Sequence, residues 1–226
     1  MPRLVSAIVL TAALPAAASA AISLSSIDDF AVTSEGWMIG NNGVQPTRDS
    51  DDGPDGQPGI LTHFSDGGGS NGRWIMRSSE ADWLGDYTAA GVTAINLQVA
   101  AVSGPDVPLY FAFDGPGGWF HTAGQVISTG DGFVPLTFDI TPGGLTHVAA
   151  SGGTGNPADT LADVTEISVI AGPGAFSYTS RGGFIRVDRS TNEIALDDIT
   201  AVPEPAVAAA LLGLAGCALR RRRSAD

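Results

Sequence analysis

The feature that most constrains this chain is the alternation of apolar and polar residues in short segments. Ile95, Leu97 and Val99 alternate with Asn96 and Gln98. Similar alternation occurs at 109–114, 134–140, 167–169, 185–187 and 194–196. Successive side chains of a β-strand point to opposite faces, so each such segment buries one face and leaves the other in water.

The connections between these segments favour one class of β fold. The chain has 30 glycines and 14 prolines, which with aspartates form turns between short strands. We therefore predict an all-β fold, an antiparallel β-sandwich of the jelly-roll type, over residues 21–200. This length suits one domain, and no internal repeat or second domain is evident. Residues 82–90 amount to at most one or two helical turns.

The N-terminal segment has the parts of a secretory signal peptide. Arg3 is its positive region, an apolar run extends from Leu4 to Ala18, and Ala18-Ser19-Ala20 resembles a signal-peptidase site. We predict that residues 1–20 are removed and that the chain is exported. A retained N-terminal anchor is the weaker alternative, because the apolar run is short and cleavable.

The C-terminal segment, residues 201–226, has three parts. Val202-Pro203-Glu204-Pro205 is followed by the uncharged residues 206–219 and then by Arg220 to Arg223. As a helix the uncharged part would be about 20 Å long, which makes it a short membrane helix. The arginines would hold the end of the chain on the cytoplasmic side. A helix in a globular core is the alternative, but such a helix rarely lacks a polar face and ends in like charges.

This layout resembles the PEP-CTERM sorting signal of Gram-negative bacteria. The resemblance implies recognition by an exosortase, a membrane-embedded transpeptidase-like enzyme, after signal peptidase has acted. It also implies an intermediate tethered in the inner membrane, a final place at the cell surface or in the extracellular matrix, and a link to exopolysaccharide and biofilm. The residues that carry the signal are Val202, Pro203, Glu204, Pro205, Arg220, Arg221, Arg222 and Arg223.

The charge of the body excludes one class of partner. Of the chain's 11 basic and 24 acidic residues, five basic and two acidic ones lie outside residues 21–200, which leaves six arginines, 22 acids and a net charge of −16. Such a surface repels nucleic acid. It suits calcium or simple solubility outside the cell.

The single cysteine, Cys217, lies in the tail. The body therefore has no disulfide and is held by its core, or by its core and a metal. Cys217 is either a small apolar residue of a membrane helix or a site of lipidation or exosortase contact.

Short motifs in the body carry a second resemblance. They are Ile27-Asp28-Asp29-Phe30, Gly36-Trp37, Gly72-Arg73-Trp74, Trp83-Leu84-Gly85-Asp86-Tyr87 and Ala195-Leu196-Asp197-Asp198-Ile199. Their order over residues 27–200 resembles galactose-binding-like jelly rolls, including laminin IV-type and carbohydrate-binding-module-like sandwiches. Trp83 stands where those sandwiches usually have Phe, and the preceding Ala-Pro is absent. The resemblance implies that Trp37, Trp74 and Trp83 pack in the core.

The same resemblance implies a calcium site near the ends of the domain. In such sandwiches the first and last strands are neighbours, which would bring Asp28 and Asp29 close to Asp197 and Asp198. Close acidic pairs repel unless a cation or an arginine neutralises them, and calcium takes carboxylate and carbonyl oxygens as ligands. Two solvated strand edges are the alternative.

A second candidate for calcium is the acidic segment around residues 47–59. Asp49, Asp51 and Asp55 are spaced like the ligands of a calcium loop, but the EF-hand pattern fails at Gly53 and at Ile60. A mobile, solvated acidic loop is the better interpretation.

Signatures of catalysis are few. His63, His121 and His147 are far apart and form no paired metal motif, and no Gly-x-Ser-x-Gly motif is present. Carboxylates are numerous enough for a glycosidase pair, but the sequence singles out no two of them. We therefore predict that the chain is not an enzyme.

Binding of sugar is better supported. Sugar sites combine an aromatic ring face with polar side chains. Trp119 and His121 lie in one glycine-rich segment, where an aromatic is expected to be exposed, and Tyr178 and Arg181 lie in another. These four are the candidate ligand-binding residues, and core packing is an equal alternative for Trp119.

Three hypotheses for function follow. The preferred one is an exported, non-catalytic surface or matrix protein whose sandwich associates with exopolysaccharide. The alternatives are a structural or adhesion protein that binds other proteins and, with less support, an extracellular polysaccharide hydrolase. An exposed aromatic surface would favour the first, an exposed strand edge the second, and two facing carboxylates in a cleft the third.

Overall fold

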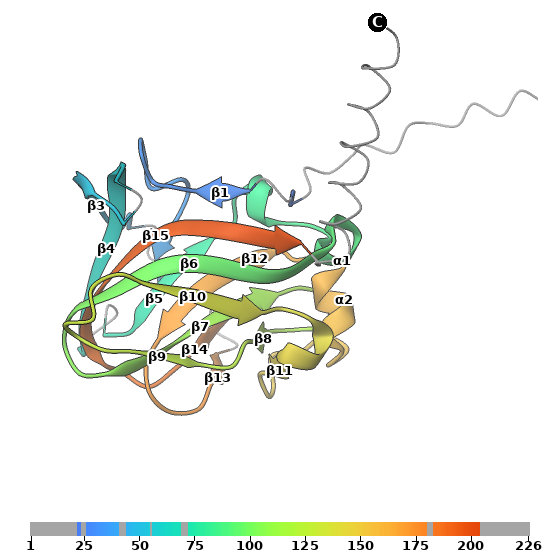
Figure 1. Cartoon of the computed structure of the whole chain (residues 1–226). Coiled ribbons are helices and arrows are strands. Elements are labelled where there is room, and N and C mark those ends of the chain that lie inside the picture. Colours follow the sequence, from blue (N-terminus) through green and yellow to red (C-terminus); the bar gives the residue numbers. More distant parts are fainter. Residues whose placement is uncertain are drawn as a thin grey trace, which may run out of the picture.

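A computed structural model describes residues 22–23, 26–40, 44–54, 56–68, 72–179 and 183–203. Figure 1 shows two antiparallel sheets packed as two layers. The predicted antiparallel β-sandwich is therefore confirmed. The predicted signal peptide and almost all of the predicted sorting signal, from Glu204 onward, lie outside the described residues.

Sheet A, the first layer, has six strands. Five follow one another in the order β10-β6-β15-β4-β3, and the short strand β1 pairs with β15. Their bounds are β1 Ile27–Asp28, β3 Thr47–Asp52, β4 Pro58–Asp66, β6 Val92–Ser103, β10 Val134–Asp139 and β15 Thr191–Pro203.

Sheet B, the second layer, has seven strands. Six follow the order β11-β8-β7-β12-β5-β2, and β9 pairs with β7. Their bounds are β2 Met38–Ile39, β5 Trp74–Ser78, β7 Val107–Asp114, β8 Phe120–His121, β9 Gln125–Ile127, β11 Thr146–His147 and β12 Glu166–Ala171. A separate hairpin joins β13 Ser177–Thr179 to β14 Phe184–Arg186.

Helices are few and short. The elements η1 Ala81–Trp83 and α1 Tyr87–Ala90 are the one or two turns expected at 82–90. The elements η2 Pro142–Gly144 and α2 Pro157–Leu161 were not predicted, although Asn156 caps α2 by accepting a bond from Ala158 N and Pro157 follows it, as at many helix starts. Within the described residues no helix is long and apolar enough to span a membrane.

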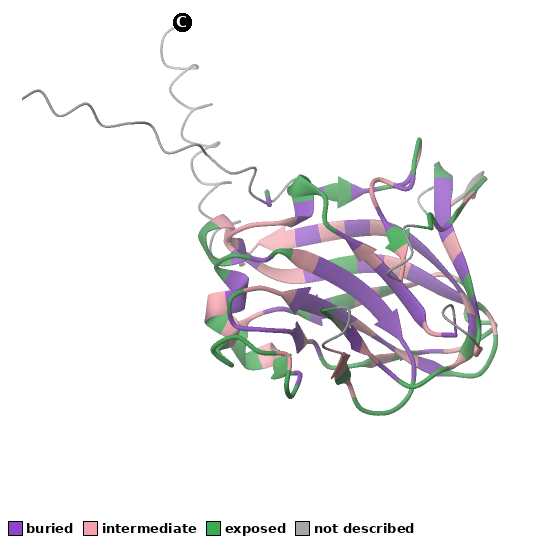
Figure 2. Ribbon diagram, turned by 180° about the vertical axis from the view of Figure 1, so that it is seen from behind, coloured by how far each residue is buried: buried purple, intermediate pink, exposed green. Residues whose placement is uncertain are grey.

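The main core lies between the two sheets and is filled by the apolar residues of the alternating segments. Leu97 of β6 and Phe111 of β7 are fully buried there, and Figure 2 shows buried residues running along the strands. The indoles of Trp37, Trp74 and Trp83 are also buried, at 0, 0 and 1% exposure, which confirms their expected role in the core.

Sheet B is covered on its other side as well. The hairpin and two loops pack against this outer face and form a second apolar cluster, the outer cluster: Ile75, Ala112, Trp119, Val148, Ile170, Ile185 and Val187, with Phe176 and Tyr178 at its border. Strand β12 is covered on both faces, so its residues 167–171 are all buried. The alternation at 167–169 had predicted that one face of this strand would be exposed to solvent.

The first and last strands of the sandwich are neighbours, as expected. Ile27 pairs with Thr200 and Asp28 pairs with Ile199 in antiparallel register. The backbone N–H of Ala201 also donates to the carbonyl of Ser26 at 3.2 Å. The two ends of the described domain therefore lie side by side in sheet A.

Candidate functional site

The outer face of sheet B carries a row of side chains contributed by six strands. Each member stands opposite the next across the sheet, so all of them share one face. The row reads Met38, Arg77, Ser168, Ala112, His121, Thr146. The outer cluster covers its centre at Ala112, which leaves the two ends of the row for contact with a ligand.

Trp119 lies inside the outer cluster and not at the surface. Its side chain is 1% exposed, and its indole N–H donates to the carbonyl of Gly183, beyond β13, at 3.1 Å. Its backbone N–H donates to Ser151 Oγ at 3.0 Å. Of the two alternatives for Trp119, exposure and core packing, the structure shows core packing: the hairpin covers the ring, which packs between the hairpin and the sheet.

An aromatic group borders the cluster. The rings of His121 and Phe176 are stacked with centroids 3.9 Å apart, and Tyr110 meets both rings edge-on at 5.7 and 4.9 Å. All three side chains are partly exposed. Gly124 makes room for this arrangement, because a Cβ there would lie 2.5 Å from Tyr110 Cε1. We call Tyr110, His121 and Phe176 the aromatic group.

His121 presents a defined hydrogen-bonding atom within this group. Its Nδ1 lies 2.8 Å from the carbonyl of Thr122, and because a carbonyl only accepts, Nδ1 carries the proton. Burial lowers the pKa of His121, so the ring is neutral at pH 7. Nε2 is then an acceptor, suited to a hydroxyl group of a ligand.

A charged group lies at the other end of the row. Arg77 Nη1 donates to Glu166 Oε1 at 3.1 Å and to Oε2 at 3.3 Å, and Glu166 stands opposite Asp114. Burial raises the pKa of Asp114. Burial also raises the pKa of Glu166, although Arg77 acts against this rise. The two ends of the row thus offer ring faces and polar groups on one side of the sheet.

The structure brings three of the four candidate ligand-binding residues to this side of sheet B. Trp119 and Tyr178 belong to the outer cluster, and His121 stacks on Phe176 at its border. Arg181 lies outside the described residues. Tyr110 and Asp114 were not predicted from the sequence. Both alternate with the core-facing residues of 109–114, so they could have been placed on the face of the strand that points away from the core.

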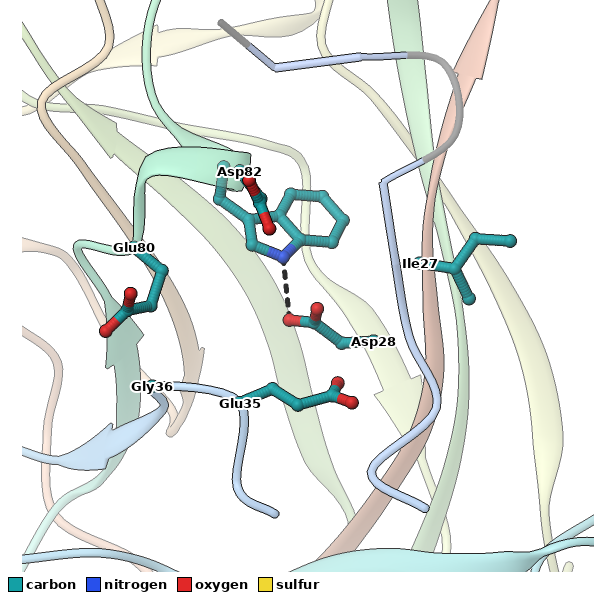
Figure 3. A pocket seen from close by; sticks show the side chains of 7 residues that line it. Ile27, Asp28, Glu35, Gly36, Glu80 and Asp82 are labelled. Carbon is teal, nitrogen blue, oxygen red and sulfur yellow. Dashed lines mark hydrogen bonds between the residues drawn. The ribbon is translucent and has the colours of Figure 1, made fainter. Parts of the chain in front are cut away.

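A second candidate is an acidic pocket of about 400 Å³ beside β1 (Figure 3). Four carboxylates line it, and Asp28 lies between Asp82 and Glu35 in this view. The full lining is Ile27, Asp28, Glu35, Gly36, Glu80, Asp82 and Trp83. Of the four acids only Asp28 was predicted from the sequence as a candidate site residue, because no motif marks the other three.

Asp28 is an acceptor that joins three segments of the chain. Its Oδ2 accepts the indole N–H of Trp37 at 2.5 Å and that of Trp83 at 2.6 Å. Burial raises the pKa of Asp28, although hydrogen bonds with Trp37, Trp83 and Glu35 act against this rise. Burial, together with the charge of Asp28, raises the pKa of Glu35 to about 7. A proton shared between these two carboxyls relieves their repulsion.

The four aspartates predicted to hold calcium do not form one cluster. Asp28 is engaged by the two indoles, Asp29 Oδ1 accepts the backbone N–H of Ala31 at 3.0 Å, and Asp197 Oδ1 accepts that of Asp198 at 2.9 Å. Among the described residues no three His, Cys, Asp or Glu side chains are grouped as a metal site would need. Calcium at these residues therefore stays a prediction.

The acidic segment at 47–59 differs from the expected loop. Residues Thr47–Asp52 form strand β3, in which Asp49 pairs with Ile60. This strand is the edge of sheet A, and charges at an edge protect it against pairing with other chains. Asp55 lies outside the described residues, and the side chain of Asp51 is not described.

Comparisons with known proteins concern the fold. No family model matches the chain, and no curated protein matches it. An exo-β-agarase structure resembles it with a TM-score of 0.50 and 11% identity, over 75% of this chain and 23% of that one. At this identity the likeness shows a shared fold, and the chain spans under a quarter of the agarase.

Two solved carbohydrate-binding modules are also similar. One, specific for non-crystalline cellulose, has a TM-score of 0.45 and 10% identity over 76% of this chain and 90% of that one. The other, a family 11 module from Clostridium thermocellum in complex with a β-1,3-1,4-mixed-linked tetrasaccharide, has a TM-score of 0.44 and 13% identity over 78% and 93%.

Proposed function

We propose that the chain is an exported, non-catalytic surface or matrix protein that associates with exopolysaccharide through the outer face of sheet B. Its export would use signal peptidase and an exosortase, with a temporary tether in the inner membrane of a Gram-negative bacterium. Residues 1–20 and 201–226 support this route by their sequence alone.

One observation supports sugar binding in particular: the partly exposed aromatic group at the border of the outer cluster. Tyr110, His121 and Phe176 contact one another and offer ring surface of the kind that packs against a pyranose. His121 Nε2 adds an acceptor, and the Arg77–Glu166 pair lies on the same face. Rings with a few directed polar groups are what a sugar site needs.

The test is affinity electrophoresis of the purified full chain in gels that contain bacterial polysaccharides. We expect retardation in at least one gel, and we expect Tyr110→Ala to abolish it. Phe64→Ala is the matched control, because Phe64 is a 52% exposed aromatic on sheet A. Equal loss in both variants, or no retardation in any gel, would refute binding at this face.

A hydrolase is the second candidate, and one observation favours it. Glu35 has a pKa raised to about 7 in an open acidic pocket, which is a property of many general acids. However, Glu35 is hydrogen-bonded to Asp28, whereas glycosidase carboxylates stand at least about 5 Å apart. Release of reducing sugar that is lost in Glu35→Gln would establish this alternative.

A structural or adhesion protein is the third candidate, and calcium remains a prediction for any of the three. Val126 of β9 is 65% exposed, and a protein partner could use it. A melting temperature that rises with added calcium and falls with EDTA would support a bound ion.

A further inference from the structure

Three buried polar atoms at one end of the sandwich have no hydrogen-bond partner within the part of the chain that the structure describes. They are His63 Nε2, Ser190 Oγ and Asn192 Oδ1. The side chains of His63 and Asn192 are only 6 and 0% exposed. Buried polar groups in folded proteins are almost always paired, because an unmade hydrogen bond is costly. These three atoms therefore point to a partner that the protein itself does not supply.

The pairing of β4 with β15 brings the three residues together. His63 stands opposite Ile194 and Ser65 stands opposite Asn192, so His63 and Asn192 are diagonal neighbours on one face of sheet A, about 7–8 Å apart along the backbone. Ile194 belongs to the main core, so this face is the inner one. Ser65 Oγ donates to the carbonyl of Ser190 at 2.8 Å, which places Ser190 beside the same pair.

The amide of Asn192 has a fixed orientation. Its Nδ2 donates to the carbonyl of Pro105 at 2.7 Å. A carbonyl only accepts, so the amide nitrogen faces Pro105 and the amide oxygen faces away from it. Gly104 lies so close that a Cβ there would be 2.7 Å from Nδ2. Asn192 Oδ1 is therefore an acceptor held in one place.

The ring of His63 is fixed in the same way. It is hydrogen-bonded to the backbone of Arg73, and since Nε2 has no partner among the described residues, the nitrogen that makes this bond is Nδ1. This bond favours the protonated ring, so Nδ1 carries a proton and the Arg73 carbonyl accepts it. Burial lowers the pKa of His63, so the ring is neutral at pH 7. Nε2 then has a free lone pair and is a second acceptor.

We propose that an internal water molecule binds between His63 Nε2, Ser190 Oγ and Asn192 Oδ1. The first and the last of these atoms are acceptors, and the hydroxyl of Ser190 can donate. A water molecule donates two hydrogen bonds, so it can satisfy both acceptors and accept from the hydroxyl at the same time. Buried waters make about three hydrogen bonds of this kind.

The water molecule joins segments that are distant in the chain. Segment 187–190 connects β14 of the hairpin to β15, and Val187 at its start belongs to the outer cluster. A water bound to Ser190 fastens the end of this segment to β4. The three residues belong neither to the aromatic group nor to the lining of the acidic pocket, so the inference is independent of the proposed function.

The direct test is a crystal structure of the full chain at a resolution that shows ordered solvent. We expect a water oxygen about 2.7–3.2 Å from each of the three atoms. A direct hydrogen bond between any two of the three atoms would overturn the proposal. So would another side chain at this position, or a site without solvent density.

A double-mutant cycle measured by urea denaturation tests the link in solution. His63→Phe keeps the size of the ring and removes Nε2, and Ser190→Ala removes only a hydroxyl. If both residues hold the same water, the second change costs less once the first has been made. We expect the double variant to differ from the product of the two single effects by more than about twofold in the unfolding equilibrium constant.

Ser78→Ala is the matched control for this cycle. It removes a buried hydroxyl that accepts the backbone N–H of Glu80 at 3.2 Å, and its effect should combine with that of His63→Phe independently, within about twofold. Independent effects in the Ser190 cycle, or equal coupling in both cycles, would overturn the shared water. The crystal structure decides the question even if a variant fails to fold.

Discussion

Trp83 donates its indole N–H to Asp28 Oδ2 at 2.6 Å, although 55 residues separate the two in the chain. Trp37, nine residues after Asp28, donates its indole N–H to the same oxygen. Since Asp28 belongs to β1, these two bonds fasten the first strand to the main core. The acid is therefore a structural acceptor within a cluster of buried tryptophans.

Removing this acceptor should destabilise the protein. In Asp28→Ala both buried indole N–H groups lose their partner, which costs about 1–3 kcal/mol each. We expect the free energy of unfolding in urea to fall by about 2–4 kcal/mol. Asp28→Asn keeps an acceptor and should lose less. Asp29→Ala, which removes one exposed local bond, is the control, and an equal loss there would contradict the prediction.

Stability should fall as pH rises toward neutrality. The pKa of Glu35 is raised from 4.5 to about 7, so the folded state binds more protons than the unfolded state between these values. The stabilisation is complete below pH 4.5 and is lost as pH passes 7. The pKa of Asp28 is also raised, and it acts in the same direction.

Thermal melts between pH 4.5 and 8.5 check this dependence. Glu35→Gln cannot ionise, so its melting temperature should change less with pH and should exceed that of the unaltered chain at pH 8.5. Glu80→Gln, on the same pocket, is the comparison. A parallel pH profile for the Glu35 variant and the unaltered chain would show that another group is responsible.

Trp119→Ala should affect stability, because the ring is buried under the hairpin. Removing a buried tryptophan typically costs about 3–5 kcal/mol. Trp119→Phe should retain much of the packing and lose the bond to Gly183. Urea denaturation of both variants checks this. If Trp119→Ala instead melted normally and lost only sugar binding, the ring would have to be accessible.

Arg77→Gln should have a modest, pH-dependent effect. It leaves Glu166 beside Asp114 without its arginine, so the pKa of Glu166 should rise further. We expect a loss of about 1 kcal/mol at pH 7 and a smaller loss at pH 4.5, because the raised pKa of Glu166 means that less of it is ionised there. The measurement is urea denaturation at the two pH values, and an equal loss at both would contradict the assignment.

Export predicts a difference between two hosts. In a Gram-negative host that has an exosortase, the mature chain should be shorter by most of residues 206–226 and leave the inner membrane. In the matched host without the enzyme it should stay in the membrane fraction. Mass spectrometry of the two fractions measures this, and identical masses in both hosts would exclude processing.

The fold could be predicted because alternation is a local property. Ile95, Leu97 and Val99 reveal a half-buried strand without knowledge of its partners, and the structure buries all three. The pattern fails where a third layer is present. Ile170 is buried in the outer cluster under the hairpin, and nothing in β12 itself signals that covering.

The candidate site could be predicted only in part, because it depends on contacts between distant segments. Trp119 lies in a glycine-rich stretch typical of exposed loops, yet Gly183, 64 residues later, covers its indole. Asp28 was singled out from the sequence as a calcium ligand, but nothing in the sequence indicates that Trp37 and Trp83 donate hydrogen bonds to it. His121 was identified by residue type, but its stacking partner Phe176 became visible only once the hairpin was positioned.

The central position of β15 has a mechanical consequence. This strand ends at Pro203, where the predicted sorting segment begins, and it is hydrogen-bonded to β6 on one side and β4 on the other. Tension applied through a C-terminal tether would pull β15 along its own axis, so the two ladders would be strained together in shear. A protein held at a cell envelope by this strand would resist flow better than one held by an edge strand, whose bonds could peel away one at a time.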